Sequence, residues 1–270
     1  MPSVRVVSLV PSLTEAVAVT APGALVGATD WCTHPADLDA VRIGGTKNPD
    51  VPAIVALAPD LVIANEEENR APDIAALRAA GVEVLVTEVR GLDQAFRELE
   101  RVLDACGAGR RPGWLVDAEA AWRDVGGIAD LGGLADLGDA GAAAGVARPG
   151  GRLRAAVPIW RRPWMVLGRD TFAGDLLARL GVDNVYAGHA ERYPRVGIDE
   201  LRDAGLDLVV LPDEPYKFTR DDGPEAFPEA LPAALVSGRH LTWYGPSLAE
   251  APGVLGEALR AAYRGHGPKG

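Results

Sequence analysis

The chain has 270 residues, of which 48% are hydrophobic, and a formal net charge of −11 at pH 7. This length and composition suit a well-packed globular protein with one large core or two lobes of ordinary size. The acidic balance argues against nucleic acid or an anionic membrane as partner, and no apolar run reaches the ~18 residues of a membrane span.

The first lobe is predicted over residues 1–109. Apolar strands at Arg5–Val10, Leu25–Thr29, Leu61–Ala64 and Val82–Thr87 alternate with helices at Leu13–Thr20, Val51–Ala58, Pro72–Ala80 and Leu92–Ala105. Gly81 stands where a helix C-terminal glycine belongs. Strands separated by helices in this rhythm predict a mostly parallel sheet covered on both faces.

A helical connector is predicted over residues 110–151. Trp114–Val125 has helical spacing, whereas the following stretch places glycines among leucines, and each interior glycine costs about 0.5–1 kcal/mol relative to alanine. The second lobe, residues 152–270, begins with strands at Ala155–Ile159 and Trp164–Leu167 and ends in a helix at Ser247–Arg264. The predicted fold is therefore α/β, with two doubly wound lobes joined by one long helical connector and a ligand cleft between them.

The two lobes repeat one pattern. Val6–Val26 and Met165–Val185 both predict a strand, a polar turn, a helix and a glycine before a second strand. Ala58–Ala64 and Gly205–Leu211 are related late strands, and both are followed by acidic residues. Order, spacing and the acidic ends together favour an internal repeat over a chance recurrence of strand–turn–helix units.

Several motifs resemble a known family. The opening Val6–Glu15, the segment Ile54–Ala64 and the aromatic segment Pro158–Met165 are similar to the substrate-binding proteins of cobalamin, haem and iron–siderophore ABC importers, in the helical-backbone metal receptor superfamily. The resemblance implies two α/β lobes joined by one helix, a bound corrinoid, haem or ferric siderophore, no cofactor and no catalytic residues. It further implies an ABC permease as partner and a periplasmic-type location.

Candidate ligand-binding residues lie in loops that follow the strands, where α/β proteins place their sites. In the first lobe, Pro11 and Ser12 open a helix, although Ser12 is equally suited to capping that helix. Trp31 offers an indole to a flat ligand, and His34 lies in the same short loop. Cys32 and His34 are both potential metal ligands, but two such residues do not make a site, and no protein metal ligand is predicted. Lys47 and Glu66 complete the first-lobe candidates.

In the second lobe, Trp160 and Arg161 combine an indole with a guanidinium, which suits a macrocycle with carboxylate or amide edges. Trp164, at a strand start, is predicted to anchor the core instead. The remaining candidates are cationic and aromatic loop residues, namely Arg169, Arg192, Tyr193, Tyr216, Trp243 and Tyr244. Single charged loop residues are usually only solvated, so the concentration of cations beside aromatics is the stronger signal.

Glu67 and Glu214 occupy matching places just beyond the related late strands. The resemblance implies that one carboxylate on each lobe docks into the permease, where such pairs would fix orientation. Two alternatives remain: a solvated charge run, or carboxylates that face the cleft and disfavour anionic ligands.

Other functions stay open at this stage. A chelatase-like enzyme or a cytosolic chelate sensor with the same two-lobed build is the alternative, although the chain lacks a phosphate-binding glycine loop and a Gly-x-Ser-x-Gly elbow. Cys32 and Cys106 read as free thiols. A monomer is expected. Met1–Pro11 lacks a secretory signal, so the chain as written is expected in the cytoplasm, or in an extracytoplasmic, anchored location if a signal was removed.

Overall fold

The protein is described from a computed structural model, which covers residues 4–123, 125 and 152–264. The chain divides into two compact units. The first comprises Met1–Glu119 and Trp243–Pro246, and the second comprises Ala120–Thr242 and Ser247–Gly270. The predicted connector begins as helix α5 (Gly113–Arg123), and its glycine-rich part at 126–151 lies outside the described residues.

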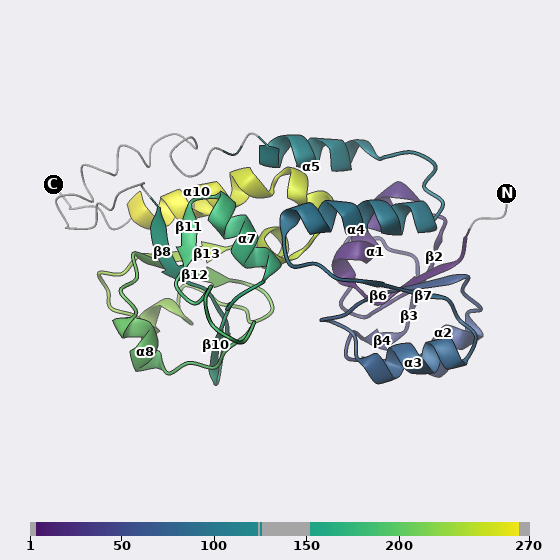
Figure 1. The fold of residues 1–270 in the computed structure, drawn as a ribbon, viewed down its shortest axis with the longest axis horizontal. Helices are drawn as coiled ribbons and strands as arrows, with labels where there is room; N and C mark the ends of the chain where they lie inside the picture. The colour runs from purple at the N-terminus through teal and green to yellow at the C-terminus, as the bar shows by residue number, and fades with distance from the viewer. Residues whose placement is uncertain (1–3, 124, 126–151, 265–270) are drawn as a thin grey trace. The chain divides into compact units, whose positions relative to one another are not determined.

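The first unit is built on a parallel sheet with strand order β3-β2-β1-β6-β7 (Figure 1). The strands are β1 (Val6–Ser8), β2 (Leu25–Ala28), β3 (Val41–Arg42), β6 (Leu61–Asn65) and β7 (Val84–Thr87). A short antiparallel pair, β4 (Gly44–Gly45) and β5 (Asn48–Pro49), follows β3. Every residue of β6 is buried, as expected for a strand covered on both faces.

Helices cover both faces of this sheet. Figure 1 shows α1 (Pro11–Thr20) and α4 (Leu92–Ala105) on one face, with α2 (Val51–Ala56) and α3 (Ala71–Ala79) on the other. The core under α2 and α3 joins Ile54 and Leu77 to apolar residues of β1 and β6. Pro11 is the first residue of α1, a position where the missing N–H of proline costs no helical hydrogen bond.

The second unit has a parallel sheet with strand order β11-β8-β12-β13. Its strands are β8 (Leu153–Ala156), β11 (Val182–Asn184), β12 (Leu208–Pro212) and β13 (Ala233–Val236). An antiparallel hairpin of β9 (Pro158–Arg161) and β10 (Trp164–Val166) follows β8 in the sequence.

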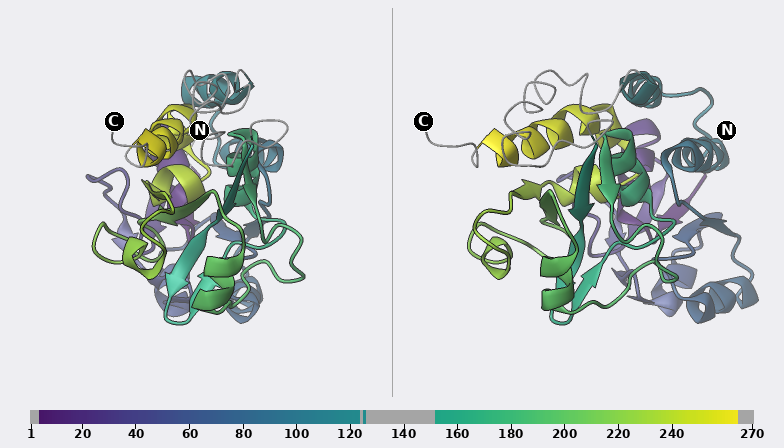
Figure 2. Two further views of the ribbon diagram at one scale, coloured as in Figure 1. Left: turned by 90° about the vertical axis from the view of Figure 1, so that its left-hand side faces the viewer. Right: turned by 60° about the vertical axis from the view of Figure 1, so that its left-hand side comes forward.

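Helices α7 (Phe172–Arg179), α9 (Gly238–Thr242) and α10 (Ala251–Arg264) pack together and against strands β11 and β13. Figure 2 shows α10, in yellow, beside the strands of this unit. The short helix α8 (Ile198–Asp203) belongs to a second core with Leu201, Val209, Leu211 and Phe218. Two 3-10 turns, η1 (Pro224–Ala226) and η2 (Pro246–Ala249), complete the described elements.

The structure confirms the predicted class, two α/β units with parallel sheets, and it also confirms the internal repeat. In both sheets the second strand of the repeat pairs with the first, and the late strand pairs with the first on its other side, which relates β2-β1-β6-β7 to β11-β8-β12-β13. The predicted alignment of Met165 with Val6 was wrong, because β10 lies in a hairpin outside the main sheet. The counterpart of β1 is β8, and the β9–β10 hairpin is an insertion before α7.

The repeat extends to one arginine in each unit, which forms equivalent hydrogen bonds at the amino ends of the strands. The Arg5 N–H donates to the Asp60 carboxylate at 2.8 Å, and the Arg154 N–H donates to the Asp207 carboxylate at 2.8 Å. Each guanidinium also donates to backbone carbonyls just before the late strand. We call these two arrangements the Arg–Asp latches, and they hold the first and late strands of each unit in register.

Several predicted element bounds were wrong at their ends. Strand β1 stops at Ser8 because Pro11 already belongs to α1, and the last predicted helix divides into η2 and α10. Strands β3 and β13 and helix α8 were not predicted, since each is only two to six residues long. In the described ranges, no helix combines the length and apolar character needed to cross a membrane.

Candidate functional site

In the first unit, the carboxyl end of β6 carries the most organised polar cluster. Asn65 ends β6 and is almost fully buried. Its side-chain oxygen accepts the N–H of Glu67 at 2.9 Å, and its amide nitrogen donates to Thr87 at the end of β7. Asn69 closes the turn by accepting the Asn65 N–H at 2.8 Å. The loop after β6 is therefore held rigidly by two asparagines and a threonine.

The segment Trp243–Pro246 belongs to this same unit. A Cβ on Gly245 would lie 2.9 Å from the Ser12 carbonyl oxygen, so glycine permits the close approach to α1. The Trp243 ring meets the His34 ring edge-on, with centroids 5.5 Å apart. Trp243 and Tyr244, expected as loop residues, are both buried. The segment Trp243–Pro246 thus meets the start of α1, the loop after β2 and the loop after β6 at the carboxyl ends of the first-unit strands.

Within this cluster, Glu68 and Tyr244 form a close pair. The Tyr244 hydroxyl donates to the Glu68 carboxyl at 3.5 Å. Burial raises the pKa of Glu68 to about 7, Glu67 adds to the rise, and Lys47 and the Tyr244 hydrogen bond oppose it. Burial, with the nearby Glu68 charge, raises the pKa of Tyr244 well above its ordinary value. This part of the site therefore resists additional negative charge.

The other acidic residues of this loop have different surroundings. Glu66 is exposed and pairs with Arg90 at 3.2 Å. Glu67 is partly buried, and its carbonyl accepts a hydrogen bond from the Lys47 ammonium at 2.5 Å. Lys47 is thereby brought to the same loop as the acidic residues.

The loop after β2 presents one large aromatic group. Trp31 is 65% exposed, whereas Cys32 is buried. The Cys32 thiol is hydrogen-bonded to the hydroxyls of Thr14 and Thr29 at 3.0 and 3.2 Å. Burial raises the pKa of Cys32, although both hydroxyls act against it. Both cysteines are free thiols, as predicted. Within the described part of the chain, no group of three or more His, Cys, Asp or Glu side chains could hold a metal ion.

The first turn of α1 brings Ser12 to the cluster. Pro11 and Ser12 are the first two residues of the helix, so Ser12 is inside the helix and is not its N-cap, which is Val10. The Ser12 hydroxyl is 3% exposed and forms no hydrogen bond of normal geometry with any described residue. It nevertheless lies close enough to the Tyr244 hydroxyl to favour ionisation of that tyrosine.

In the second unit, Trp160 and Tyr216 form the accessible aromatic pair. Trp160 is 43% exposed, and the two ring centroids are 5.6 Å apart in an edge-on arrangement. The Tyr216 hydroxyl donates to Asp222 at 2.6 Å. Trp164 instead packs on the core next to Phe218, as predicted. The second unit therefore presents an indole whose neighbouring ring is held in place.

The positive charge of Arg161 is compensated by two carboxylates of its own unit. Its guanidinium pairs with both Asp222 and Glu225 and lies 5.5 Å from the centre of the Trp164 ring. Only 16% of the Arg161 side chain is exposed. Asp222 thus pairs with Arg161 and accepts the hydrogen bond of the Tyr216 hydroxyl, so Arg161 helps to hold Tyr216 beside Trp160.

The remaining second-unit candidates fall into two groups. Arg169 is exposed beside Asp170, while Arg192 donates to the Asp170 carbonyl at 3.1 Å and lies over the Tyr193 ring. These three candidates thus gather around one turn. Glu214 lies elsewhere, at the end of β12 against Gly238, whose N–H donates to Asp213 at 2.6 Å.

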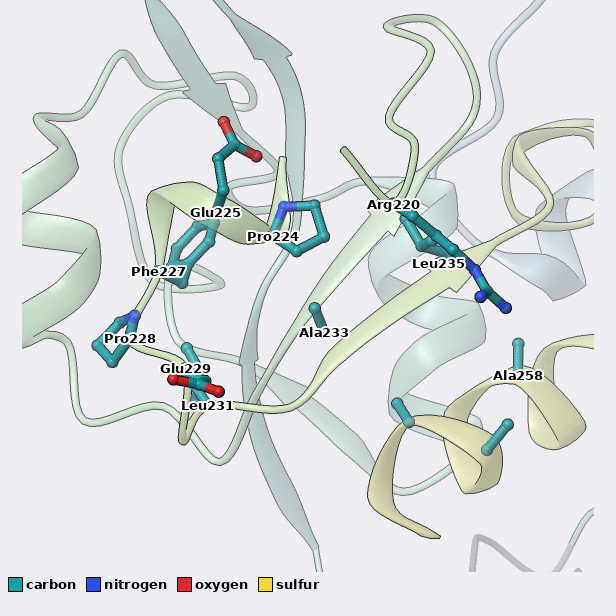
Figure 3. A pocket seen from close by; sticks show the side chains of 12 residues that line it. Arg220, Pro224, Glu225, Phe227, Pro228, Glu229, Leu231, Ala233, Leu235 and Ala258 are labelled. Atoms are coloured by element: carbon teal, nitrogen blue, oxygen red, sulfur yellow. The ribbon is translucent and has the colours of Figure 1, made fainter. Parts of the chain in front are cut away.

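A cavity of about 840 Å³ lies beside β13, the edge strand of the second sheet, and α10 (Figure 3). Phe227, Leu235 and Ala258 contribute apolar walls, and Arg220 and Glu229 contribute charges. The predicted ligand-binding residues are not among those that line it. Glu225, the ion-pair partner of Arg161, does line it.

Sequence reasoning missed Asn65, Asn69 and Thr87, and it gave Glu68 only as a substitute for Glu67. The signal was the spacing Asn65-Glu-Glu-Glu-Asn69 directly after an apolar strand, since asparagines commonly hydrogen-bond the backbone of a following turn. The burial of Glu68 had no such signal, because Tyr244 is 176 residues away in sequence.

These two units have the fold of periplasmic vitamin B12- and heme-binding proteins, which is the fold that the resemblance of the motifs implies. The periplasmic vitamin B12 binding protein BtuF of Vibrio cholerae matches with a TM-score of 0.69, over 97% of this chain and 99% of its own, at 17% identity. The periplasmic heme-binding protein RhuT of Roseiflexus sp. RS-1 matches with a TM-score of 0.69, over 96% and 99%, at 21% identity. A periplasmic heme binding protein of Pseudomonas aeruginosa matches with a TM-score of 0.69, over 95% and 92%, at 23% identity.

Among curated proteins, the uncharacterized ABC transporter substrate-binding lipoprotein YvrC of Bacillus subtilis is 33% identical over 116 residues. That match covers 42% of this chain and 37% of the relative's length. No family model matches the sequence. The similarity to solved structures establishes the fold.

Proposed function

We propose that this protein is the substrate-binding component of an ABC importer, and that it binds a corrinoid, haem or ferric siderophore without chemical turnover. The main support is a fold shared with B12- and heme-binding proteins over at least 95% of this chain. The proposal includes an extracytoplasmic site of action, as in the periplasmic and lipoprotein relatives.

In this proposal each unit contributes a different kind of contact. The second unit offers the Trp160 indole as a stacking surface, supported by Tyr216, and the cations Arg169 and Arg192. The first unit offers Trp31 and the polar cluster around Ser12 and Tyr244. Lys47, His34, Tyr193 and Trp243 line or support these surfaces.

The permease is the proposed macromolecular partner. Glu67 and Glu214, each two residues beyond the related strands β6 and β12, are the proposed docking carboxylates. Two charge pairs on a two-unit body fix orientation more than they add affinity.

The test is direct binding of candidate chelates. The purified protein is incubated with cyanocobalamin, haemin, a ferric hydroxamate and a ferric catecholate, and is then passed over a gel-filtration column. We expect the visible spectrum of one chelate to co-elute with the protein at about one per chain and to stay unchanged with time. If none co-elutes at micromolar concentration, the proposal is wrong, and a spectrum that changes with turnover would favour a chelatase-like enzyme.

The stacking contact is tested with Trp160→Ala, which we expect to weaken binding by about 1–3 kcal/mol while the fold is retained. Trp160→Phe keeps an aromatic face and serves as the matched control. Equal affinity of wild type and Trp160→Ala in equilibrium titration would remove Trp160 from the site.

A further inference from the structure

Glu68 differs from the two carboxylates beside it. Glu66 is exposed and paired with Arg90, and the ammonium of Lys47 lies on the carbonyl of Glu67. Glu68 is partly buried and forms no ion pair with any described residue, and the contact that reaches its carboxyl is the hydroxyl of Tyr244. The carboxyl group is therefore contacted by a neutral hydroxyl, and its own charge is only partly compensated.

A second observation points into the same place. The Ser12 hydroxyl is almost fully buried next to Tyr244 and has no hydrogen-bond partner of normal geometry among the described residues. Buried hydroxyls normally have a partner, so this one is available to a bound molecule. The Thr87 hydroxyl is engaged by Asn65 and by the Ala64 carbonyl. Ser12, Glu68 and Tyr244 thus form a small polar face.

The charged groups that face Glu68 oppose each other. Glu67 disfavours a second negative charge, whereas Lys47 and the Tyr244 hydroxyl favour it, and burial outweighs both. A ligand carboxylate placed here would meet two acidic side chains in a poorly hydrated site, which is unfavourable. An amide or hydroxyl edge would instead donate to the Glu68 carboxylate and accept from Ser12 or Tyr244.

We propose that Glu68 is a specificity-determining residue, which with Ser12 and Tyr244 selects chelates whose edge carries neutral amides or hydroxyls and rejects an edge that carries carboxylates. This inference rests on the proposed chelate-binding function. It narrows the ligand class at one unit of the site, independently of the metal.

Matched ligand pairs with the same core test it. One pair is cyanocobalamin and its derivative with one peripheral amide hydrolysed to a carboxylate, and the other is haem and its propionate diamide. For whichever core binds, we expect the neutral member to bind about tenfold more tightly at pH about 8.5, and the preference to shrink at pH about 6 as Glu68 takes up a proton. Glu68→Gln should reduce the preference to about twofold or less at both pH values.

Glu88→Gln is the matched control, because the Glu88 carboxylate is partly exposed and pairs with Arg90 at 2.6 Å, and it should keep the wild-type preference. If Glu68→Gln does not fold, the wild-type comparison at the two pH values still decides. A preference that is absent, or that does not change with pH or with Glu68→Gln, overturns the role of Glu68 while the chelate-binding function stands. Failure of both cores to bind overturns the proposed function as well.

Discussion

The two units have the same hydrogen-bonding arrangement at the amino ends of their sheets and different arrangements at the carboxyl ends. At the amino ends, Arg5–Asp60 and Arg154–Asp207 form the same latch, with the same 2.8 Å hydrogen bond. At the carboxyl ends, the first unit holds its loop with asparagine side chains, whereas the second holds Asp213 and Glu214 against the backbone of Gly238. The repeat therefore supplies the scaffold, and each unit holds the loops after its strands in its own way.

The largest expected effect is a loss of stability in the second unit, where Gly238 packs against Glu214. A Cβ at position 238 would lie 2.6 Å from the Glu214 backbone nitrogen and 2.5 Å from its Cβ. Because backbone must shift to admit it, we expect Gly238→Ala to lower the free energy of unfolding of the second unit by about 3 kcal/mol. Urea denaturation measures this, and Gly188→Ala, with open space around its Cβ, is the control. A Gly238→Ala variant as stable as this control would show that the loop is not held by close packing.

A smaller effect is expected in the first unit, whose stability should depend on pH through Glu68. Folding raises the pKa of Glu68 from 4.5 to about 7, so the native state binds the proton more tightly than the unfolded chain does. The resulting stabilisation is present below pH 4.5 and is lost as pH rises to about 7. After allowance for partial exposure, we expect Glu68 to account for a loss of about 1–2 kcal/mol between the two limits.

Urea denaturation of wild type and Glu68→Gln at pH about 5 and about 8 isolates this contribution, since other titrating groups cancel in the difference. The variant should lose less stability than wild type over this range. Parallel pH profiles for the two proteins would contradict the burial of Glu68.

The smallest expected effect concerns the turns before the related strands β6 and β12. Ala58 has a positive φ of 46°, and Gly205 has a φ of 64° at the corresponding place. Because an L-residue is disfavoured there, Gly205→Ala should destabilise its unit by about 1 kcal/mol, and Ala58→Gly should stabilise the first unit by about 0.5 kcal/mol. Thermal unfolding of both variants measures the two signs. Effects of the same sign would mean that the turns are not equivalent.

The fold was predictable where the signal is local. Apolar strands such as Leu61–Asn65 and the amphipathic helix Leu92–Ala105 need only their own residues to be recognised. The repeat was also visible, but its alignment was wrong at Met165, because a hairpin and a sheet strand have the same apolar pattern.

The candidate site was predictable in its loops and less so in its contacts. Trp160 and Trp31 are exposed as a stacking residue requires. The pairing of Arg161 with Asp222 and Glu225 depends on side chains more than 60 residues away, which periodicity does not reveal. Opposite charges and burial decide such contacts only after the chain has folded.

The return of Trp243–Pro246 to the first unit has a consequence for biosynthesis. A nascent chain that has reached Glu119 contains the whole parallel sheet of this unit, yet it lacks Tyr244, the hydrogen-bond partner of Glu68. Contacts between residues so distant in sequence form late, because closing a long loop costs conformational entropy before the contact stabilises it. The first unit is therefore completed only after Pro246 has been synthesised, long after its sheet.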